Sequence, residues 1–260
     1  MTDLLSLFPS GSALDADGVL SIDGCRADAL ATEFGTPVLV VAERTLRARA
    51  REYADELVSR WPESRVVFAS KAFPCTAVQR VMVSEGLGLD VAGGGEILTA
   101  LKAGIDPALI VLHGNAKSDE EIAMAVEHGI GLVVVDNSDD VDRLEATVPA
   151  GRSQDVLIRI IPGVTADTHA HILTGHEGSK FGLSPADAAP LIKRIEHSSR
   201  VRMRTADSTF SLTASSSACW EAVSWSWPRP SRHQRSRNTS SKTTQNACSR
   251  KRHELPPKTP

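Results

Sequence analysis

The sequence alternates short β-branched runs with longer amphipathic stretches at a nearly constant spacing. Predicted strands begin near Val66, Leu89, Ile110, Leu132 and Val156, at separations of 23, 21, 22 and 24 residues. Their continuous apolar runs are typical of strands buried on both faces of a parallel sheet. So regular a repeat favours a (β/α) barrel over a doubly wound sheet, whose units vary more in length. We therefore predict an α/β fold, a partial (β/α) barrel with about five strand–helix units.

Helical patterns fill the intervals between the predicted strands. Residues 42–59 place apolar side chains at helical spacing among Arg and Glu, and the run PVLVV at 37–41 before them predicts a further strand. Ser118 and Glu121 form a capping box ahead of another helix, which Gly129 is expected to end. These local signals agree with the predicted strand–helix repeat.

The composition changes abruptly near residue 204. All 18 glycines lie at or before Gly182, whereas residues 205–260 carry nine Lys/Arg against three Asp/Glu. With 14 hydrophobic residues among 56, this tail cannot bury enough surface to offset the entropy of ordering it. A disordered basic arm, a nucleic-acid-binding tail and a change of reading frame all remain open. We favour the change of reading frame, and therefore predict a disordered tail at 205–260.

A barrel with so few units cannot close, because closure requires about eight strands. We therefore expect the first and fifth predicted strands, near Val66 and Val156, to leave unpaired edges that favour aggregation. The tail is expected neither to cover these edges nor to resist proteolysis. Reading the coding DNA in its other frames beyond codon 204 would show whether the tail is out of frame.

Charge and cysteine content exclude several classes of protein. The net charge of −3 gives no reason to expect nucleic acid or an anionic membrane as a partner. No run approaches the roughly 18 apolar residues of a membrane span, and the N-terminus lacks the basic region of a secretory signal. No two of the four cysteines form a CxxC pair, so we expect a reducing, cytoplasmic compartment.

Several polar residues fall at or just beyond the carboxyl ends of the predicted strands, where barrel enzymes place their chemistry. They are Lys71, Asp90, His113–Asn115, Asp136 and Arg159. Lys71 is the sharpest candidate, because it leaves a buried strand beside the apolar neighbours Ala72 and Phe73. A lysine amine taken out of water becomes a nucleophile able to form a Schiff base with a carbonyl cofactor. The alternative is an ordinary solvated lysine at a strand end.

Two other motifs carry weaker signals. The glycines of GGGE at 93–96 could hold a phosphate, but we interpret them as a tight turn that presents Glu96. His169, His171 and His176 could ligate zinc, yet only Glu177 stands near them to complete a ligand set. We therefore predict no metal site.

Six blocks occur in order along the first 204 residues: FASKA, LDVAGGGEILTALKAG, VLHGNAKS, LVVVDN, RIIPGV and TGHEGSKFGL. Together they resemble the diaminopimelate decarboxylase family of alanine-racemase-like, pyridoxal-phosphate-dependent barrel enzymes, over roughly residues 20–204. The resemblance implies that Lys71 forms a Schiff base with pyridoxal 5′-phosphate. It also implies that Asp90 and Glu96 lie beside the cofactor, with Arg159 near its ring.

The resemblance further implies a small-molecule amino-acid substrate, meso-diaminopimelate, which is decarboxylated to L-lysine by a homodimer. Residues 1–35 would join a β-rich second domain, and residues 36–204 would form the incomplete barrel. The family's HxHxGS strand, glycine-rich phosphate loop, ExGR motif and C-terminal β-domain are not found, so we expect this chain to be truncated and inactive. An ornithine or arginine decarboxylase of the same group, and a non-catalytic binding protein with a basic tail, remain alternatives.

Overall fold

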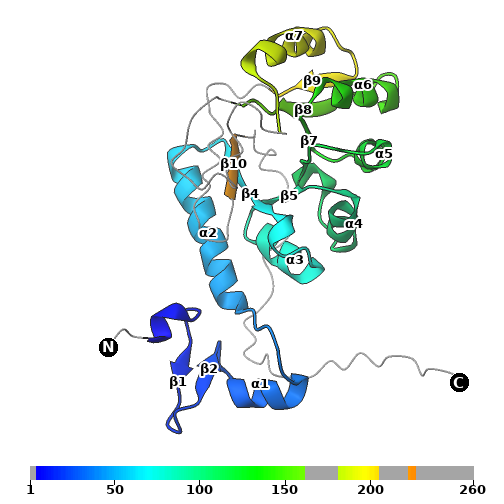
Figure 1. Cartoon of the computed structure of the whole chain (residues 1–260). Helices are drawn as coiled ribbons and strands as arrows, with labels where there is room; N and C mark the ends of the chain where they lie inside the picture. The colour runs from blue at the N-terminus through cyan, green and yellow to red at the C-terminus, as the bar shows by residue number, and fades with distance from the viewer. Residues whose placement is uncertain (1–3, 162–180, 205–221, 227–260) are drawn as a thin grey trace, which may run out of the picture. The chain divides into compact units, whose positions relative to one another are not determined.

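The computed structural model describes residues 4–161, 181–204 and 222–226 of the 260-residue chain (Figure 1). Every described residue belongs to the first of the chain's two units, Met1–Trp227. No helix within the described ranges is long and apolar enough to cross a membrane.

A seven-stranded sheet forms the centre of the first unit, in the order β10-β4-β5-β6-β7-β8-β9. Its parallel strands are β4 (Ser64–Ala69), β5 (Gly88–Val91), β6 (Ile110–Leu112), β7 (Leu132–Val135), β8 (Gln154–Ile158) and β9 (Val201–Met203). The strand β10 (Ala222–Ser226) pairs antiparallel with β4.

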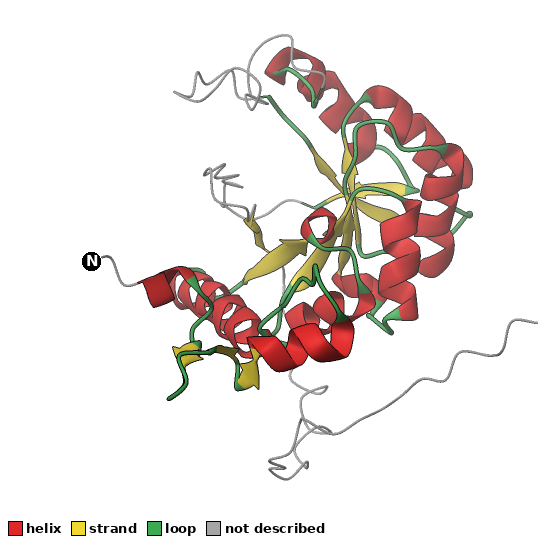
Figure 2. Cartoon of the chain, turned by 60° about the horizontal axis from the view of Figure 1, so that its bottom comes forward, coloured by secondary structure: helices red, strands yellow, loops and turns green. Residues whose placement is uncertain are grey.

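Helices precede or connect the parallel strands and follow one face of the sheet (Figure 2). They are α2 (Glu43–Arg60), α3 (Thr76–Ser84), α4 (Gly94–Lys102), α5 (Asp119–His128), α6 (Ser138–Thr147) and α7 (Pro185–Glu196), with short 3-10 turns η2 (Ser70–Ala72) and η3 (Pro107–Leu109). The main core lies between sheet and helices and includes Leu89, Ile110 and Val133. Val67, Val111 and Val134 form a smaller cluster on the opposite face.

The predicted α/β fold is confirmed, because the five predicted strands are β4 to β8, parallel and in consecutive order. The helix expected at 42–59 is α2. At the start of α5, the hydroxyl of Ser118 accepts from the Glu121 amide, and the Glu121 carboxylate accepts from the Ser118 amide. Gly129 ends α5 with a φ of 71°, as its position predicted.

The strand predicted at 37–41 is wrong. These residues form an irregular connection to α2, with Val38 43% and Leu39 81% exposed. A β-branched run becomes a strand only when a neighbour supplies hydrogen bonds and packing, and no described strand lies beside this one.

The expectation of unpaired edges on the first and fifth strands is also wrong. β8 pairs in parallel with β9, and β4 pairs along five residues with β10, which lies inside the compositional tail. Strands pair through backbone groups that nearly every residue carries. The side-chain composition of the tail therefore did not reveal the pairing of β10. Within the described residues the sheet runs from β10 to β9 without closing, as predicted. The division into 1–35, 36–204 and 205–260 remains a prediction.

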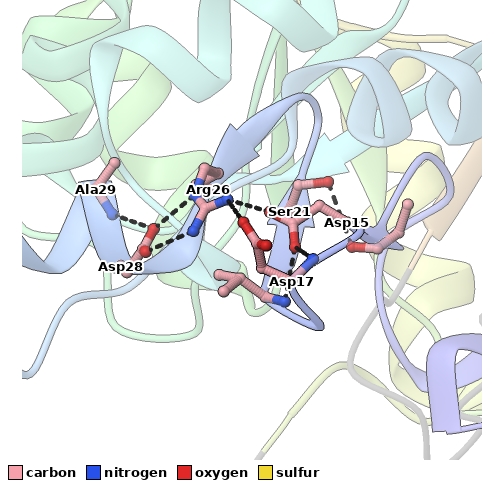
Figure 3. Close-up of polar contacts among 8 residues, drawn as sticks. Asp15, Asp17, Ser21, Arg26, Asp28 and Ala29 are labelled. Carbon is pink, nitrogen blue, oxygen red and sulfur yellow. Dashed lines mark hydrogen bonds and ion pairs between the residues drawn. The ribbon is translucent and has the colours of Figure 1, made fainter.

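The N-terminal residues form a small element of their own. The turn η1 (Leu4–Leu7) precedes a three-stranded antiparallel sheet of β1 (Ala13–Leu14), β2 (Leu20–Ile22) and β3 (Cys25–Arg26), and α1 (Ala27–Phe34) follows. Arg26 pairs with Asp15, Asp17 and Asp28, as Figure 3 shows. Hydrogen bonding to Arg26 holds the pKa of Asp28 below its usual value. These contacts join the small sheet to the first turn of α1.

Glu85 joins α2 to the end of α3 and gives a testable dependence on pH. Its carboxylate accepts from Arg47 at 2.7 Å and from Arg51 at 2.9 Å. Burial acts to raise the pKa of Glu85, but the two arginines outweigh burial and hold the pKa below its usual value. A carboxylate with a lowered folded pKa stabilises the protein above its unfolded pKa of about 4.3, and that stability is lost as the pH falls through the folded value.

We therefore expect Glu85→Gln to lower the free energy of unfolding at pH 7 by about 1–2 kcal/mol. Between pH 7 and pH 3, the free energy of unfolding of this variant, measured in urea, should fall less than that of the unsubstituted chain. Glu56→Gln, which removes the exposed pair of Glu56 with Arg60, serves as the control and should change little. Equal pH dependence for Glu85→Gln and the unsubstituted chain would contradict the assignment.

Candidate active site

The parallel strands β4 to β8 all end at the same edge of the sheet, and this edge gathers the predicted polar residues. Lys71 lies in η2 after β4, and Asp90 lies near the end of β5; His113, Asp136 and Arg159 follow β6, β7 and β8 directly. Ala69, the last residue of β4, pairs with Asp90 of the neighbouring strand β5. Lys71 follows shortly after Ala69, so it lies just beyond the level of Asp90. The predicted placement of these residues on one edge is confirmed.

Lys71 stands in a tight turn rather than in the strand itself. The turn η2 is closed by the amide of Phe73, which donates to the carbonyl of Ser70 at 3.0 Å. Lys71 and its neighbour Ala72 are exposed, and Phe73 is 37% exposed. The expected desolvation of Lys71 is therefore not found, because the turn carries the lysine past the end of the buried strand. Lys71 is instead an exposed residue at the carboxyl edge of the sheet.

Asp90 forms a short contact with a histidine from the next strand. The Nδ1 atom of His113 lies 2.7 Å from Oδ1 of Asp90, and both side chains are largely buried. The His113 amide donates to the carbonyl of Val91 at 2.7 Å, which fixes the backbone at the same place. An ionised carboxylate can only accept, so we assign the proton of this contact to Nδ1 of His113.

Arg159 is held by an acid and an aromatic ring. Its Nη1 atom lies 3.2 Å from Oδ1 of the buried Asp136, and its guanidinium lies 4.5 Å from the centre of the Phe181 ring. The chain brings Phe181 there because the Leu183 amide donates to the Arg159 carbonyl at 2.9 Å. The sequence analysis assigned no role to Phe181, although it lies in the TGHEGSKFGL block.

Glu96 closes the glycine turn at the start of α4. Its Oε2 atom accepts from the Ala92 amide at 2.6 Å, while the Gly94 amide donates to Glu121 at 2.8 Å. Carboxylates thus occupy two amides that a phosphate would need, in agreement with the interpretation of GGGE as a turn. The position of Glu96 beside a cofactor remains a prediction.

A second lysine near this edge was not identified from the sequence. Lys117 forms an ion pair with Asp140 at 2.8 Å, and both side chains are fully buried. Its Nζ atom also donates to the carbonyl of Gly114 at 2.6 Å. A carbonyl cofactor needs a lysine that it can reach; Lys71 is an exposed residue, whereas Lys117 is buried. The ion pair of Lys117 has no local sequence signal, because Asp140 belongs to α6, a separate element.

The three histidines considered as zinc ligands, His169, His171 and His176, lie outside the described residues. Within the ranges that the structure covers, no group of three or more His, Cys, Asp or Glu side chains is arranged to hold a metal ion.

The fold and the polar edge define the class: an α/β domain of the (β/α)-barrel type, with an accessible lysine and paired charged groups at the carboxyl ends of its strands. Residues 43–204 match the family described as pyridoxal-dependent decarboxylase, pyridoxal binding domain. The chain belongs to this family, whose cofactor is pyridoxal phosphate.

Individual relatives agree with this assignment. Diaminopimelate decarboxylase from Mycobacterium tuberculosis is 42% identical over 210 residues, which cover 78% of this chain and 46% of that protein. The Bacillus subtilis enzyme of the same name is 46% identical over 166 residues, 64% of this chain and 38% of that one.

The crystal structure of diaminopimelate decarboxylase from M. jannaschii in co-complex with L-lysine matches with a TM-score of 0.65 and 31% identity, covering 74% of this chain and 46% of that one. The resemblance stated from the sequence blocks is thus confirmed. The chain spans less than half the length of the curated relatives it matches.

Proposed function

We propose that the complete protein decarboxylates meso-diaminopimelate to L-lysine, in lysine biosynthesis, with pyridoxal 5′-phosphate as cofactor. The observation that carries this proposal is Lys71, an exposed lysine at the carboxyl edge of a domain that matches the pyridoxal-binding domain of decarboxylases. The choice of substrate rests on relatives named diaminopimelate decarboxylase at 42–46% identity.

Lys71 is the residue proposed to hold the cofactor covalently. Lys71 is an exposed residue, whereas Lys117 is fully buried in an ion pair with Asp140. When bound, pyridoxal phosphate supplies a ring that takes up the electron pair released as carbon dioxide leaves. The protein's own part is to present the amine, fix the charges around it and hold protons at defined atoms.

The two charged pairs at the edge have separate roles in this proposal. Asp90 accepts the Nδ1 proton of His113, so the imidazole ring is held in one orientation at the edge. Asp136 and the Phe181 ring restrict Arg159, so its guanidinium stays at the edge, where it can bind a carboxylate or phosphate oxygen. Glu96 shapes the adjacent turn through the Ala92 amide.

The expected partners follow from the family. The substrate is a small amino acid, in keeping with the L-lysine bound to the M. jannaschii relative. We expect the complete protein to be a cytoplasmic homodimer that binds neither nucleic acid nor membrane. Light scattering on the purified complete protein measures the oligomeric state, and a stable monomer would contradict this expectation.

The reaction is tested with a chimera that joins residues 1–204 to the C-terminal half of the Bacillus subtilis relative. Loaded with pyridoxal phosphate and given meso-diaminopimelate, it should release carbon dioxide and L-lysine in equal amounts, and Lys71→Ala should abolish both. The 260-residue chain alone is the control and should release neither. A chimera that decarboxylates ornithine or arginine instead would contradict the proposed substrate.

A further inference from the structure

A buried polar pair links the turn that carries Lys71 to α3. Gln79 of α3 donates from Nε2 to Oγ of Ser70 at 2.7 Å, and both side chains are fully buried. The other buried residues of α3 are apolar: Val78, Val81 and Met82. Ser70 immediately precedes Lys71 in η2, so this hydrogen bond ties the turn of the lysine to the helix layer.

Stability alone does not account for this pair. The Oε1 atom of Gln79 is buried and has no hydrogen-bond partner within the described part of the chain. An unsatisfied buried amide oxygen lowers stability, whereas apolar side chains at both positions of the pair would avoid that loss. Gln79 is therefore better explained by its hydrogen bond to Ser70 in η2 than by a contribution to the free energy of folding.

The backbone continues the link between turn and helix. The Phe73 amide donates to the Ser70 carbonyl at 3.0 Å, the Cys75 amide to the Phe73 carbonyl at 2.8 Å, and the Gln79 amide to the Cys75 carbonyl at 3.1 Å. Together with the side-chain bond, these contacts form a closed loop from η2 to α3 and back. Such a loop fixes the backbone from which Lys71 projects.

We propose that Ser70 and Gln79 are positioning residues that hold η2, so that the Lys71 amine meets the aldehyde carbon of pyridoxal phosphate in a fixed orientation. In that step the Lys71 nitrogen gives up two protons as it forms a double bond to the aldehyde carbon, and the carbonyl oxygen leaves as water. No electrons are exchanged with another reactant. The inference rests on the proposed function, because that function assigns the aldehyde to Lys71.

The test compares the full chain with Ser70→Ala, Gln79→Met and the double variant. Each protein is incubated with pyridoxal phosphate, reduced with borohydride and digested, and the label on Lys71 is measured against the label on exposed Lys102 in the same molecule. Urea unfolding and hydrogen exchange of the Phe73 amide are measured in parallel. Ser70→Ala removes a single oxygen, so it keeps the test valid if Gln79→Met folds poorly.

We expect each single variant to lower the ratio of Lys71 label to Lys102 label by about tenfold, because a small displacement of a reacting group slows its reaction strongly. The double variant should lower the ratio no further, since the two residues act as one unit. Exchange of the Phe73 amide should become faster, while the double variant unfolds at the same or a higher urea concentration. A purely structural pair would instead lower stability and leave the label ratio unchanged, and that result would overturn the inference.

The two proposals fail in different ways. If the unsubstituted chain shows no preference for Lys71 over Lys102, the proposed function fails. The positioning inference is then decided by hydrogen exchange alone. Faster exchange of the Phe73 amide in Gln79→Met supports the hold on η2, and unchanged exchange refutes it.

Discussion

Replacing Lys117 with methionine is expected to lower the free energy of unfolding by about 3–5 kcal/mol. Methionine fills a similar volume but leaves the carboxylate of Asp140 fully buried without its ammonium partner at 2.8 Å. Among the described residues, Arg143 also pairs with Asp140, but it lies 3.7 Å from the other carboxylate oxygen, too far to replace the lost contact. Chemical denaturation at neutral pH measures the effect.

A second substitution separates the buried charge from general repacking. Lys117→Met combined with Asp140→Leu removes both charges, and most of the lost stability should return. The exposed pair between Glu56 and Arg60 is the matched control, and Glu56→Gln should change stability by about 0.5 kcal/mol or less. If the double variant were no more stable than Lys117→Met alone, the ion pair would not be the source of the effect.

Gly131→Ala is expected to be comparably damaging, with a loss of about 2–4 kcal/mol. A Cβ atom on Gly131 would lie 2.4 Å from the carbonyl oxygen of Ala108 and 2.9 Å from its carbonyl carbon. These are backbone atoms, and the Gly131 amide is itself bound to the Pro107 carbonyl at 2.9 Å. Neither segment can move aside without breaking the junction between η3 and β7.

Gly95→Ala is the matched control for this prediction. Nothing lies within 4 Å of a Cβ atom at Gly95, and the residue is in the first turn of α4. Alanine there should raise stability by about 0.5 kcal/mol. Thermal melting of the two variants beside the unsubstituted chain checks both values, and a Gly131→Ala variant that melts with the unsubstituted chain would contradict the steric account.

The sheet was predictable because its strands are buried on both faces. In β7, Leu132 and Val134 face one cluster while Val133 and Val135 face the other, so the whole run is apolar and stands out in the sequence. The capping box at Ser118 was predictable because all of its contacts lie within four residues.

Features that depend on distant partners were not predictable in the same way. The pairing of Ser70 with Gln79, of Lys117 with Asp140 and of β10 with β4 arises only when separate elements meet. Conversely, the run at 37–41 has the composition of a strand but meets no described strand. Composition and periodicity describe one segment at a time, and tertiary contacts decide these cases.

The candidate site, too, was predictable from local patterns but not in its contacts between distant segments. The strand–helix repeat predicted that Lys71, Asp90 and Arg159 share one edge, because parallel neighbours end together. It could not predict that Asp90 contacts His113 or that Phe181 covers Arg159, since the partners come from other segments. The exposure of Lys71 was missed for a local reason, because the 3-10 turn after β4 has no clear sequence signal.

Covalent capture of pyridoxal phosphate on the full chain tests the central claim, that Lys71 is the cofactor lysine of this domain. The chain is incubated with the cofactor near neutral pH, reduced with borohydride, digested and mapped by mass spectrometry, with Lys71→Arg as the control. We predict one dominant label on Lys71, its loss in Lys71→Arg, and none on the buried Lys117. Label spread evenly over exposed lysines such as Lys102 and Lys193, or concentrated on any lysine other than Lys71, would contradict the claim.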